Sequence, residues 1–193
     1  MFSIPKAENL SQEQQSSKCV PVGPSALLVR FSDFLPHSGL ALDLACGYGR
    51  NTLYLAREGL PAIGIDGSRK ALLAGREAAI RSKLEACFLQ ADLTRFGLPA
   101  NKFSVVICFK YRNREFYPSI RAALRPGGLL LYETYTCEHM LYGLKPRNPE
   151  HLLERGELYG AFSDWDIIFY REVWRGRGVA SLVARKPLSA GEC

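Results

Sequence analysis

The stretch from Leu40 to Gly59, LALDLACGYGRNTLYLAREG, limits the possible folds of this chain more than any other part of the sequence. It begins with an apolar run that carries one acid, Asp43, and continues through a Cys-Gly-Tyr-Gly turn into apolar residues at helical spacing. A buried strand that passes through a glycine turn into a helix points backbone N–H groups at the space above the turn. The sequence therefore predicts a ligand-binding loop at this turn.

Strands and helices alternate along the first two thirds of the chain. Short apolar runs predict further strands at 62–65, 86–90, 103–109 and 129–134. Apolar residues at helical spacing predict helices at 26–35, 69–84 and 115–124. Buried strands that alternate with helices predict a parallel sheet joined by right-handed crossovers.

The last third of the chain has a different pattern. Residues 135–160 are rich in Pro and Gly, and we expect an elaborated loop there with one short helix, Glu150–Glu154. Two long β-rich segments, Trp165–Val173 and Val179–Arg185, follow and are joined by Arg-Gly-Arg-Gly. Two strands separated by a short loop that contains glycine form an antiparallel hairpin. We expect this hairpin to close the edge of the sheet.

Length and composition place these elements in one domain. A chain of 193 residues that is 47% hydrophobic has the composition of a globular protein, and a chain of this size buries roughly 70% of its unfolded surface. The sequence thus predicts an α/β fold with a mostly parallel sheet and a C-terminal antiparallel hairpin. Residues 1–20 are polar and rich in Ser and Gln, so we expect a flexible N-terminal tail before a single domain over 21–193.

The charge balance is mildly basic. The chain has 25 Lys and Arg residues against 19 Asp and Glu residues, and the net charge of +6 is spread along the sequence. This balance permits an anionic substrate or some affinity for RNA, and it does not indicate a nucleic-acid partner. No apolar run approaches the ~18 residues that span a membrane, and the N-terminus lacks the apolar segment of a signal peptide. We therefore expect no membrane association.

Cysteine and histidine usage favours a reducing compartment and argues against a metal site. None of the six cysteines forms a C-x-x-C pair, which argues against a zinc ribbon. Several of them lie in or beside strand-like runs, where a reduced Cys acts as a small hydrophobe. We expect a cytoplasmic protein on this basis. The three histidines have no spacing typical of metal ligands, so no metal site is predicted.

A dinucleotide site is the first alternative for the glycine turn. The dinucleotide fingerprint is G-x-G-x-x-G, and here Gly47 and Gly49 are followed by Asn51 and Thr52 without a third glycine. The third glycine permits close packing of the helix on the strand, so its absence weakens the dinucleotide interpretation. Asp66 follows Gly49 at a spacing that suits a ribose-binding acid, whether the ligand is a dinucleotide or another nucleoside-containing cofactor.

Four segments in order, DLACGYGRNT, GIDGS, QADL and RPGGLLLYET, resemble the motif series of class I S-adenosylmethionine-dependent methyltransferases. The resemblance covers residues 40–134, and the hairpin suits the last two strands of that family. Within the family, the chain is similar to small members of the tellurite- and thiopurine-detoxification type. The resemblance implies the three-layer, Rossmann-like α/β fold of methyltransferases, with a seven-stranded, mostly parallel sheet and a C-terminal antiparallel hairpin. It also implies methyltransferase activity and S-adenosyl-L-methionine as cofactor.

The resemblance also implies a set of cofactor-binding residues. The glycine turn would bring backbone close to the methionine part of the cofactor, where a Cβ would block the approach. Asp43 would hold the amino end, Asp66 would bind the ribose hydroxyls, and Asp92 would accept a hydrogen bond from the adenine amine. Phe109 and Lys110 would lie beneath the methyl donor. The full cofactor-binding set comprises Asp43, Ala45, Cys46, Gly47, Gly49, Asn51, Asp66, Gly67, Ser68, Ala91, Asp92, Leu93 and Phe109.

Several of these residues also have a purely structural interpretation. Gly47 and Gly49 would fit any turn from strand to helix, and Asp92 would fit a helix cap or a solvated acid. We interpret Cys46 as a packing residue, because no nearby histidine supports a thiolate and methyl transfer needs no covalent intermediate. The aromatic residues of the hairpin are interpreted as core and cross-strand packing.

The acceptor side is indicated less directly. Methyl transfer requires chiefly that donor and acceptor are aligned and that water is excluded, so a general base is optional for a thiol, a selenol or a soft anion. Tyr111 and His139 are the candidate catalytic residues, since both lie just beyond predicted strand ends near the expected pocket. Arg112 and Arg114 are interpreted as part of a solvated crossover.

Three functions are compatible with these observations. The first is methyl transfer from S-adenosylmethionine to a small, soft or anionic acceptor. The second is methylation of a macromolecule, either tRNA or protein, and the third is a non-catalytic, cofactor-binding partner subunit. The absence of a visible recognition domain in 193 residues favours the first.

Overall fold

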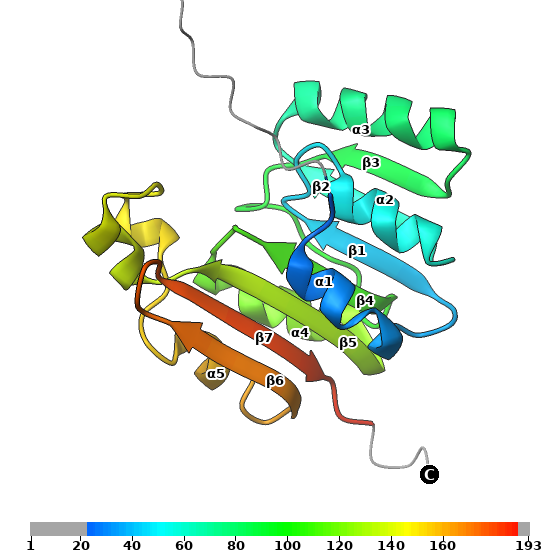
Figure 1. Cartoon of the computed structure of the whole chain (residues 1–193). Coiled ribbons are helices and arrows are strands. Elements are labelled where there is room, and N and C mark those ends of the chain that lie inside the picture. The colour runs from blue at the N-terminus through cyan, green and yellow to red at the C-terminus, as the bar shows by residue number, and fades with distance from the viewer. Residues whose placement is uncertain (1–22, 189–193) are drawn as a thin grey trace, which may run out of the picture.

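The computed structural model describes residues 23–188, so the tail expected over residues 1–20 lies outside the described residues. The described chain forms one sheet with helices on both faces (Figure 1). No helix within 23–188 combines the length and the apolar character needed to cross a membrane.

The sheet has seven strands in the order β3-β2-β1-β4-β5-β7-β6. β7 runs antiparallel to both of its neighbours, β5 and β6, and the other pairs are parallel. The predicted fold class is therefore confirmed, including the C-terminal hairpin. The strands are β1 Leu40–Leu44, β2 Ala62–Asp66, β3 Ala86–Gln90, β4 Phe103–Phe109, β5 Leu124–Tyr135, β6 Asp166–Val173 and β7 Val179–Arg185.

Within residues 23–188, five α-helices cover the two faces of the sheet, and a hydrophobic core lies under each face. Leu27 and Leu28 of α1 and Leu55 of α2 pack on one face, whereas Ile120 of α4 and Leu158 of α5 pack on the other. α3 lies beside α2 and contacts β3 at the edge of the sheet (Figure 1). The helices are α1 Ala26–Arg30, α2 Arg50–Arg57, α3 Arg69–Ser82, α4 Tyr117–Ala123 and α5 Glu157–Ala161.

The segment between β5 and β6 differs from its prediction. The helix expected at Glu150–Glu154 is wrong: Pro149–His151 forms only a 3-10 turn, and the α-helix, α5, begins at Glu157. Gly156, with φ +71°, changes the direction of the chain before α5. The region that we expected to be mainly loop also contains a second 3-10 helix, Cys137–Tyr142. We call residues 136–161 the insert.

Two other boundaries were shifted by features that periodicity does not reveal. The helix expected over 26–35 is divided into α1 and a 3-10 turn, Ser32–Phe34. β5 begins at Leu124, earlier than the predicted 129, because the chain pairs with β4 through an irregular register at Phe103 to Val105. Neither change moves the carboxyl end of a strand, where parallel sheets place their ligands.

The parallel registers bring four loops to one edge of the sheet. Leu44 at the end of β1 is opposite both Ile65 of β2 and Cys108 of β4, and Asp66 is opposite Gln90 of β3. The loops that follow β1, β2, β3 and β4 therefore lie side by side, on the left-hand side of Figure 1.

Gly49 allows α2 to start close to the sheet. Its φ is +76°, and a Cβ built on it would overlap Cε1 of Phe88, a side chain of β3. The glycine therefore serves both the left-handed turn and the packing of α2 against its neighbour. Gly59, which ends the same helix segment at φ +86°, has no atom within 4 Å of its would-be Cβ.

We expect Gly49→Ala to lower the free energy of unfolding by about 3 kcal/mol, since it combines left-handed strain with a clash in the core. Gly59→Ala is the matched control and should cost only about 1 kcal/mol, because it carries the strain alone. Urea unfolding of the two variants measures the difference. Equal losses would show that Phe88 moves aside without cost.

Candidate functional site

The glycine turn after β1 has an unusual backbone and an open space above it. Ala45, Gly47 and Gly49 all have positive φ, at 55°, 56° and 76°. The Gly47 N–H donates a hydrogen bond of 2.8 Å to Oδ2 of Asp66. A Cβ built on Gly47 would meet no atom of residues 23–188 within 4 Å, so no described residue fills the space above it. A non-glycine residue such as Ala45 in the left-handed region stores strain, which is common at binding sites.

Asp66 links the ends of β1 and β2. Its Oδ2 accepts from Gly47, and its Oδ1 accepts a 2.8 Å hydrogen bond from the Ser68 N–H. Each carboxylate oxygen has room for a second hydrogen bond. Asp66 therefore holds the turn in shape and keeps acceptor capacity toward the cleft that it lines.

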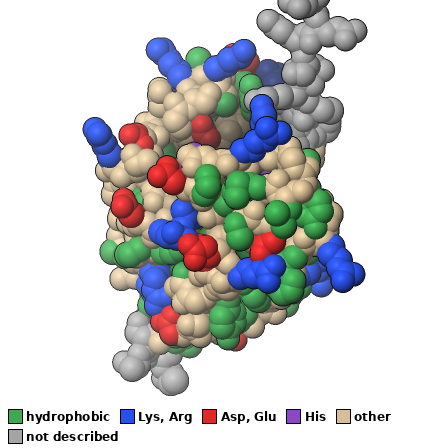
Figure 2. All heavy atoms as spheres, turned by 90° about the vertical axis from the view of Figure 1, so that its left-hand side faces the viewer, with side chains coloured by type: hydrophobic (Ala, Val, Ile, Leu, Met, Phe, Trp, Pro, Cys, Tyr) green, Lys and Arg blue, Asp and Glu red, His purple; other side chains and the backbone are tan. Residues whose placement is uncertain are grey.

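A cleft in two connected chambers lies over the carboxyl edge of the sheet. The larger chamber, over β2 and β3, has a volume of about 670 Å³, and the smaller one, over the glycine turn and β4, has about 370 Å³. Ala45, Asp66 and Tyr111 line both chambers and so mark their junction. These volumes are in the range of small-molecule sites. Figure 2 looks onto this edge, and the surface is hollowed in its upper part.

Most of the predicted site residues are brought together by this cleft. Those that line it are Ala45, Cys46, Gly47, Asn51, Asp66, Gly67, Ala91, Asp92, Leu93, Phe109 and Tyr111. Four predicted residues do not line it: Asp43 lies beneath the turn, Gly49 packs on Phe88, Ser68 caps α3 through its Oγ, and His139 lies in the insert.

Asp43 is buried in the sheet. Only 1% of the residue is exposed, and its Oδ2 accepts a 2.7 Å hydrogen bond from the Thr52 hydroxyl of α2. Burial raises the pKa of Asp43 to about 7, and the hydrogen bonds from Thr52 and the positive charge of Arg50 offset only part of this effect. The carboxyl group is thus near its midpoint of ionisation at neutral pH.

Cys46 and Tyr111 are kept protonated by the same physical cause. Burial raises the pKa of the Cys46 thiol above its usual range, and the negative charges of Asp43 and Asp66 add to the effect. Burial also raises the pKa of the half-buried Tyr111 phenol. Cys46 is therefore suited to packing rather than to nucleophilic attack, as its sequence context predicted.

Asp92 lies at the rim of the larger chamber as an ionised acid. Its Oδ1 accepts hydrogen bonds from the Thr94 N–H at 2.9 Å and from the Thr94 hydroxyl at 2.7 Å. These two hydrogen bonds lower the pKa of Asp92. No helix begins at Asp92, so it is not a helix cap; it is exposed, as a solvated acid would be, and it also closes a turn with Thr94.

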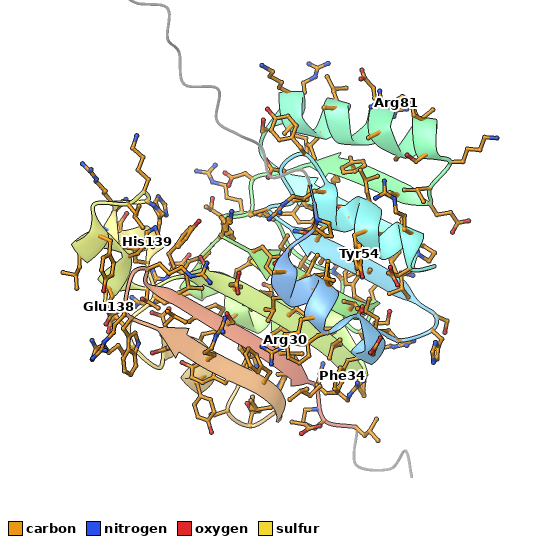
Figure 3. All side chains as sticks on the ribbon, viewed as in Figure 1. Arg30, Phe34, Tyr54, Arg81, Glu138 and His139 are labelled. Carbon is orange, nitrogen blue, oxygen red and sulfur yellow. The ribbon has the colours of Figure 1, made fainter. Side chains whose placement is uncertain are left out.

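His139 is held inside the insert. It is 4% exposed, its ring stacks on Tyr135 with centroids 4.1 Å apart, and its Nε2 is 3.0 Å from the Lys145 carbonyl oxygen. That carbonyl is an acceptor only, so Nε2 carries the proton and Nδ1 is left as a buried atom without a partner among the described residues. Figure 3 shows His139 beside Glu138 in the insert.

The expectation of a solvated crossover was wrong for Arg112. Its side chain is 8% exposed and forms an ion pair with Glu157, whereas Arg114 is 48% exposed and pairs with both Glu154 and Glu157. The reason is tertiary: the crossover packs against the insert, whose acids could not be assigned to it from sequence spacing.

Four residues that line the cleft were not predicted: Tyr48, Arg50, Gln90 and Thr94. The position of Arg50 could have indicated a role in the cleft. A cation at the first residue of a helix opposes the helix dipole, and the first turn of α2 has no acid to compensate it. Gln90 ends a strand beside Asp92, where the strand-end rule already placed the ligand.

Comparison with known proteins agrees with this geometry. A family model described as a methyltransferase domain matches residues 41–128, which contain the glycine turn, Asp66 and Asp92. The protein named "Putative methyltransferase YqeM" of Bacillus subtilis is 33% identical over 111 residues, covering 53% of this chain and 44% of that protein. This chain spans less than half the length of the curated relatives that it matches.

Solved structures share the fold at low sequence identity. TehB from Haemophilus influenzae aligns with a TM-score of 0.68 at 19% identity, covering 83% of this chain and 61% of TehB. An S-adenosylmethionine-dependent methyltransferase from Mesorhizobium loti also aligns with a TM-score of 0.68 at 19% identity, covering 83% of this chain and 98% of that protein. These likenesses show that the chain shares the fold of these proteins.

The buried Asp43 makes stability depend on pH. Its pKa is about 7 in the folded chain, whereas the ordinary value of 3.8 applies to the unfolded chain, so the folded state binds the proton more tightly. The free energy of unfolding should therefore fall as pH rises from 4 to 7, by up to about 1.4 kcal/mol per pH unit. Asp43→Asn keeps the acceptor for Thr52 and removes this titration. Urea unfolding at pH 5, 6 and 7 compares the two proteins, and parallel profiles would contradict the assignment.

Proposed function

We propose that this chain transfers a methyl group from S-adenosylmethionine to a small, soft or anionic acceptor. The proposal is supported by the match of residues 41–128 to a methyltransferase domain and by the fold shared with S-adenosylmethionine-dependent methyltransferases. One observation carries the proposal. The glycine turn, Asp66 and Asp92, which belong to three separate loops, line one cleft at the carboxyl edge of the sheet. This is the place where open parallel sheets bind ligands.

The residues of the cleft fit the cofactor. The open space above Gly47 would accept its methionine part, and Asp66 would accept hydrogen bonds from the ribose hydroxyls with its remaining lone pairs. At the far end of the larger chamber, Asp92 would accept from the adenine amine through Oδ2, which has no hydrogen bond within residues 23–188. Asp43 would support the turn from below and, when ionised, would favour the cationic amino end.

The bound cofactor supplies a methyl group activated by its sulfonium. The chain contributes alignment and exclusion of water, which are the main requirements of a direct displacement. Phe109 and Tyr111 are placed to do this, since Phe109 lines the smaller chamber and Tyr111 lines both. The Tyr111 phenol, protonated because burial raises its pKa, would donate a hydrogen bond rather than remove a proton.

The protonation states of the cleft favour an acceptor that needs no general base. Among the described residues that line it, there is no histidine, and the high pKa values of Cys46 and Tyr111 keep both groups protonated. The two carboxylates, Asp66 and Asp92, would be taken up by the ribose hydroxyls and the adenine amine once the cofactor is bound, in addition to the N–H donors that they already hold. A thiolate, a selenolate or another soft anion reacts without giving up a proton, which supports this acceptor class over a neutral alcohol or amine.

Positive charge in the smaller chamber supports an anionic acceptor. Arg50 and Lys110 both line this chamber, and Asp66 is the one acid that does so in the part of the chain that the structure describes. Lys110 adopts φ +60°, and its N–H donates to the Glu133 carbonyl oxygen at 2.7 Å, so its backbone is held beside β5. We also propose a reducing compartment, in agreement with the four free cysteines among the described residues.

Cofactor binding should depend on the turn and its acid. Asp66→Ala removes a charged acceptor, and we expect about 100-fold weaker binding of S-adenosylhomocysteine by calorimetry. Gly47→Val should abolish binding, because a branched residue is strained at φ +56° and fills the space above the turn. Glu77→Ala, on the exposed side of α3, is the control and should bind as the wild type does. Undiminished affinity in both site variants would refute the assignment of the cofactor cleft.

Acceptor preference should depend on charge. At pH 7.5, we expect methylation of 4-mercaptobenzoate to exceed that of thiophenol by about tenfold in kcat/KM, since only the former carries a carboxylate for the cationic chamber. Lys110→Gln should reduce this ratio, and Lys70→Gln, an exposed residue of α3, should leave it unchanged. Cofactor binding without methylation of any small acceptor would favour a non-catalytic partner subunit instead.

A further inference from the structure

A cluster of charged and polar groups outside the cleft converges on one acid, Glu157. This residue begins α5 in the insert, and its side chain is 13% exposed. It accepts hydrogen bonds from Nε of Arg112 at 3.3 Å, from Nη2 of Arg114 at 2.6 Å and from the Tyr117 hydroxyl at 3.0 Å. The Glu154 N–H adds a fourth at 2.9 Å. A surface ion pair involves one donor and one exposed carboxylate, whereas this shielded carboxylate accepts from four groups.

Two of the three side-chain donors, Arg112 and Arg114, come from the segment that links β4 to α4, and the third, Tyr117, is the first residue of α4. Arg112 is the most deeply placed, at 8% side-chain exposure, and its Nη1 also donates to the Glu150 carbonyl oxygen at 2.5 Å. The link between β4 and α4 is therefore bound to the insert at several points. Without Glu157, the guanidinium of Arg112 would be left shielded from water and without a charged partner, which is costly.

The same link forms a wall of the cleft. Tyr111, which lines both chambers, directly precedes Arg112, and Lys110, which lines the smaller one, precedes Tyr111. Lys110 holds a left-handed backbone at φ +60°. Strain of this kind persists only where surrounding contacts over-determine the conformation. The Arg112–Glu157 contact is one of those contacts, two residues away along the chain.

The insert is itself fixed to the sheet, so that Glu157 is a firm anchor. The Leu153 N–H donates to the Tyr135 carbonyl oxygen at 2.9 Å, which ties the insert to the end of β5. On the other side, the Gly156 N–H donates to Oε1 of Glu172 in β6 at 2.8 Å. The position of Glu157, the next residue, is thus set by contacts with β5 and β6. Neither strand contributes a described residue to the lining of the cleft.

We propose that Glu157 is a positioning residue for the cleft: by binding Arg112 and Arg114, it fixes Tyr111 and Lys110 at the junction of the two chambers. The proposal rests on the proposed function, because it assumes that the cleft binds the cofactor. The insert then stabilises the wall of the cleft through contacts on the side that faces away from the cleft. Glu157 itself does not line the cleft.

The test compares Glu157→Gln with Leu158→Val, a change in the fully buried neighbour on the same helix. Both variants should lower the melting temperature. At a temperature where both are folded, we expect Glu157→Gln to bind S-adenosylhomocysteine about tenfold more weakly by calorimetry, and Leu158→Val to bind as the wild type does. Hydrogen exchange should be faster over residues 110–116 in Glu157→Gln alone.

A second variant keeps the test decisive if Glu157→Gln does not fold. Tyr117→Phe removes one hydrogen bond to Glu157 and keeps the ring that packs on Tyr132 and Phe162. We expect a loss of affinity of about twofold to threefold with faster exchange over 110–116. Wild-type affinity and exchange in every folded variant would overturn the positioning role. Failure of the wild-type chain to bind S-adenosylhomocysteine would instead refute the proposed function, so the two failures are distinguishable.

Discussion

The hydrogen bond from the Gly47 N–H to Asp66 is the contact on which the cleft depends. It joins the loop after β1 to the end of β2 at 2.8 Å and so holds the glycine turn open above the sheet. The second oxygen of Asp66 accepts from Ser68, which caps α3. One carboxylate therefore sets the geometry of two strand ends and of a helix start, and it still faces the cleft.

Burial determines the chemistry of the groups around that contact. It raises the pKa of Asp43 toward neutrality, and it keeps Cys46 and Tyr111 protonated. A cleft with protonated side chains, and with carboxylates that the cofactor would take up, is poorly equipped to remove a proton. It is better equipped to orient reactants and exclude water, which is what methyl transfer to a soft nucleophile requires. Arg50 and Lys110 place positive charge in the smaller chamber, which is the basis of the proposed preference for an anionic acceptor.

The outer support of the cleft comes from the part of the chain that is least regular. The insert after β5 contains short helices and turns, and it was expected to be mainly loop. In the folded chain, its Glu157 binds Arg112 and Arg114 of the cleft wall, and its backbone is tied to β5 and β6. Residues more than forty positions apart thus form one cluster, which no local pattern in the sequence could disclose.

The sequence by itself determined the alternation of strands and helices, the hairpin and the order of the site motifs, because local periodicity and the glycine turn depend on neighbours along the chain. It placed Asp66 and Asp92 at strand ends, and parallel pairing then brought them to one edge. Only the tertiary structure decided which residues are buried there. It placed Asp43 beneath the turn, Gly49 against Phe88, His139 inside the insert and Arg112 against Glu157. Burial and ion pairing are properties of the packed chain, and they arise between segments whose distance in sequence carries no information about their contact.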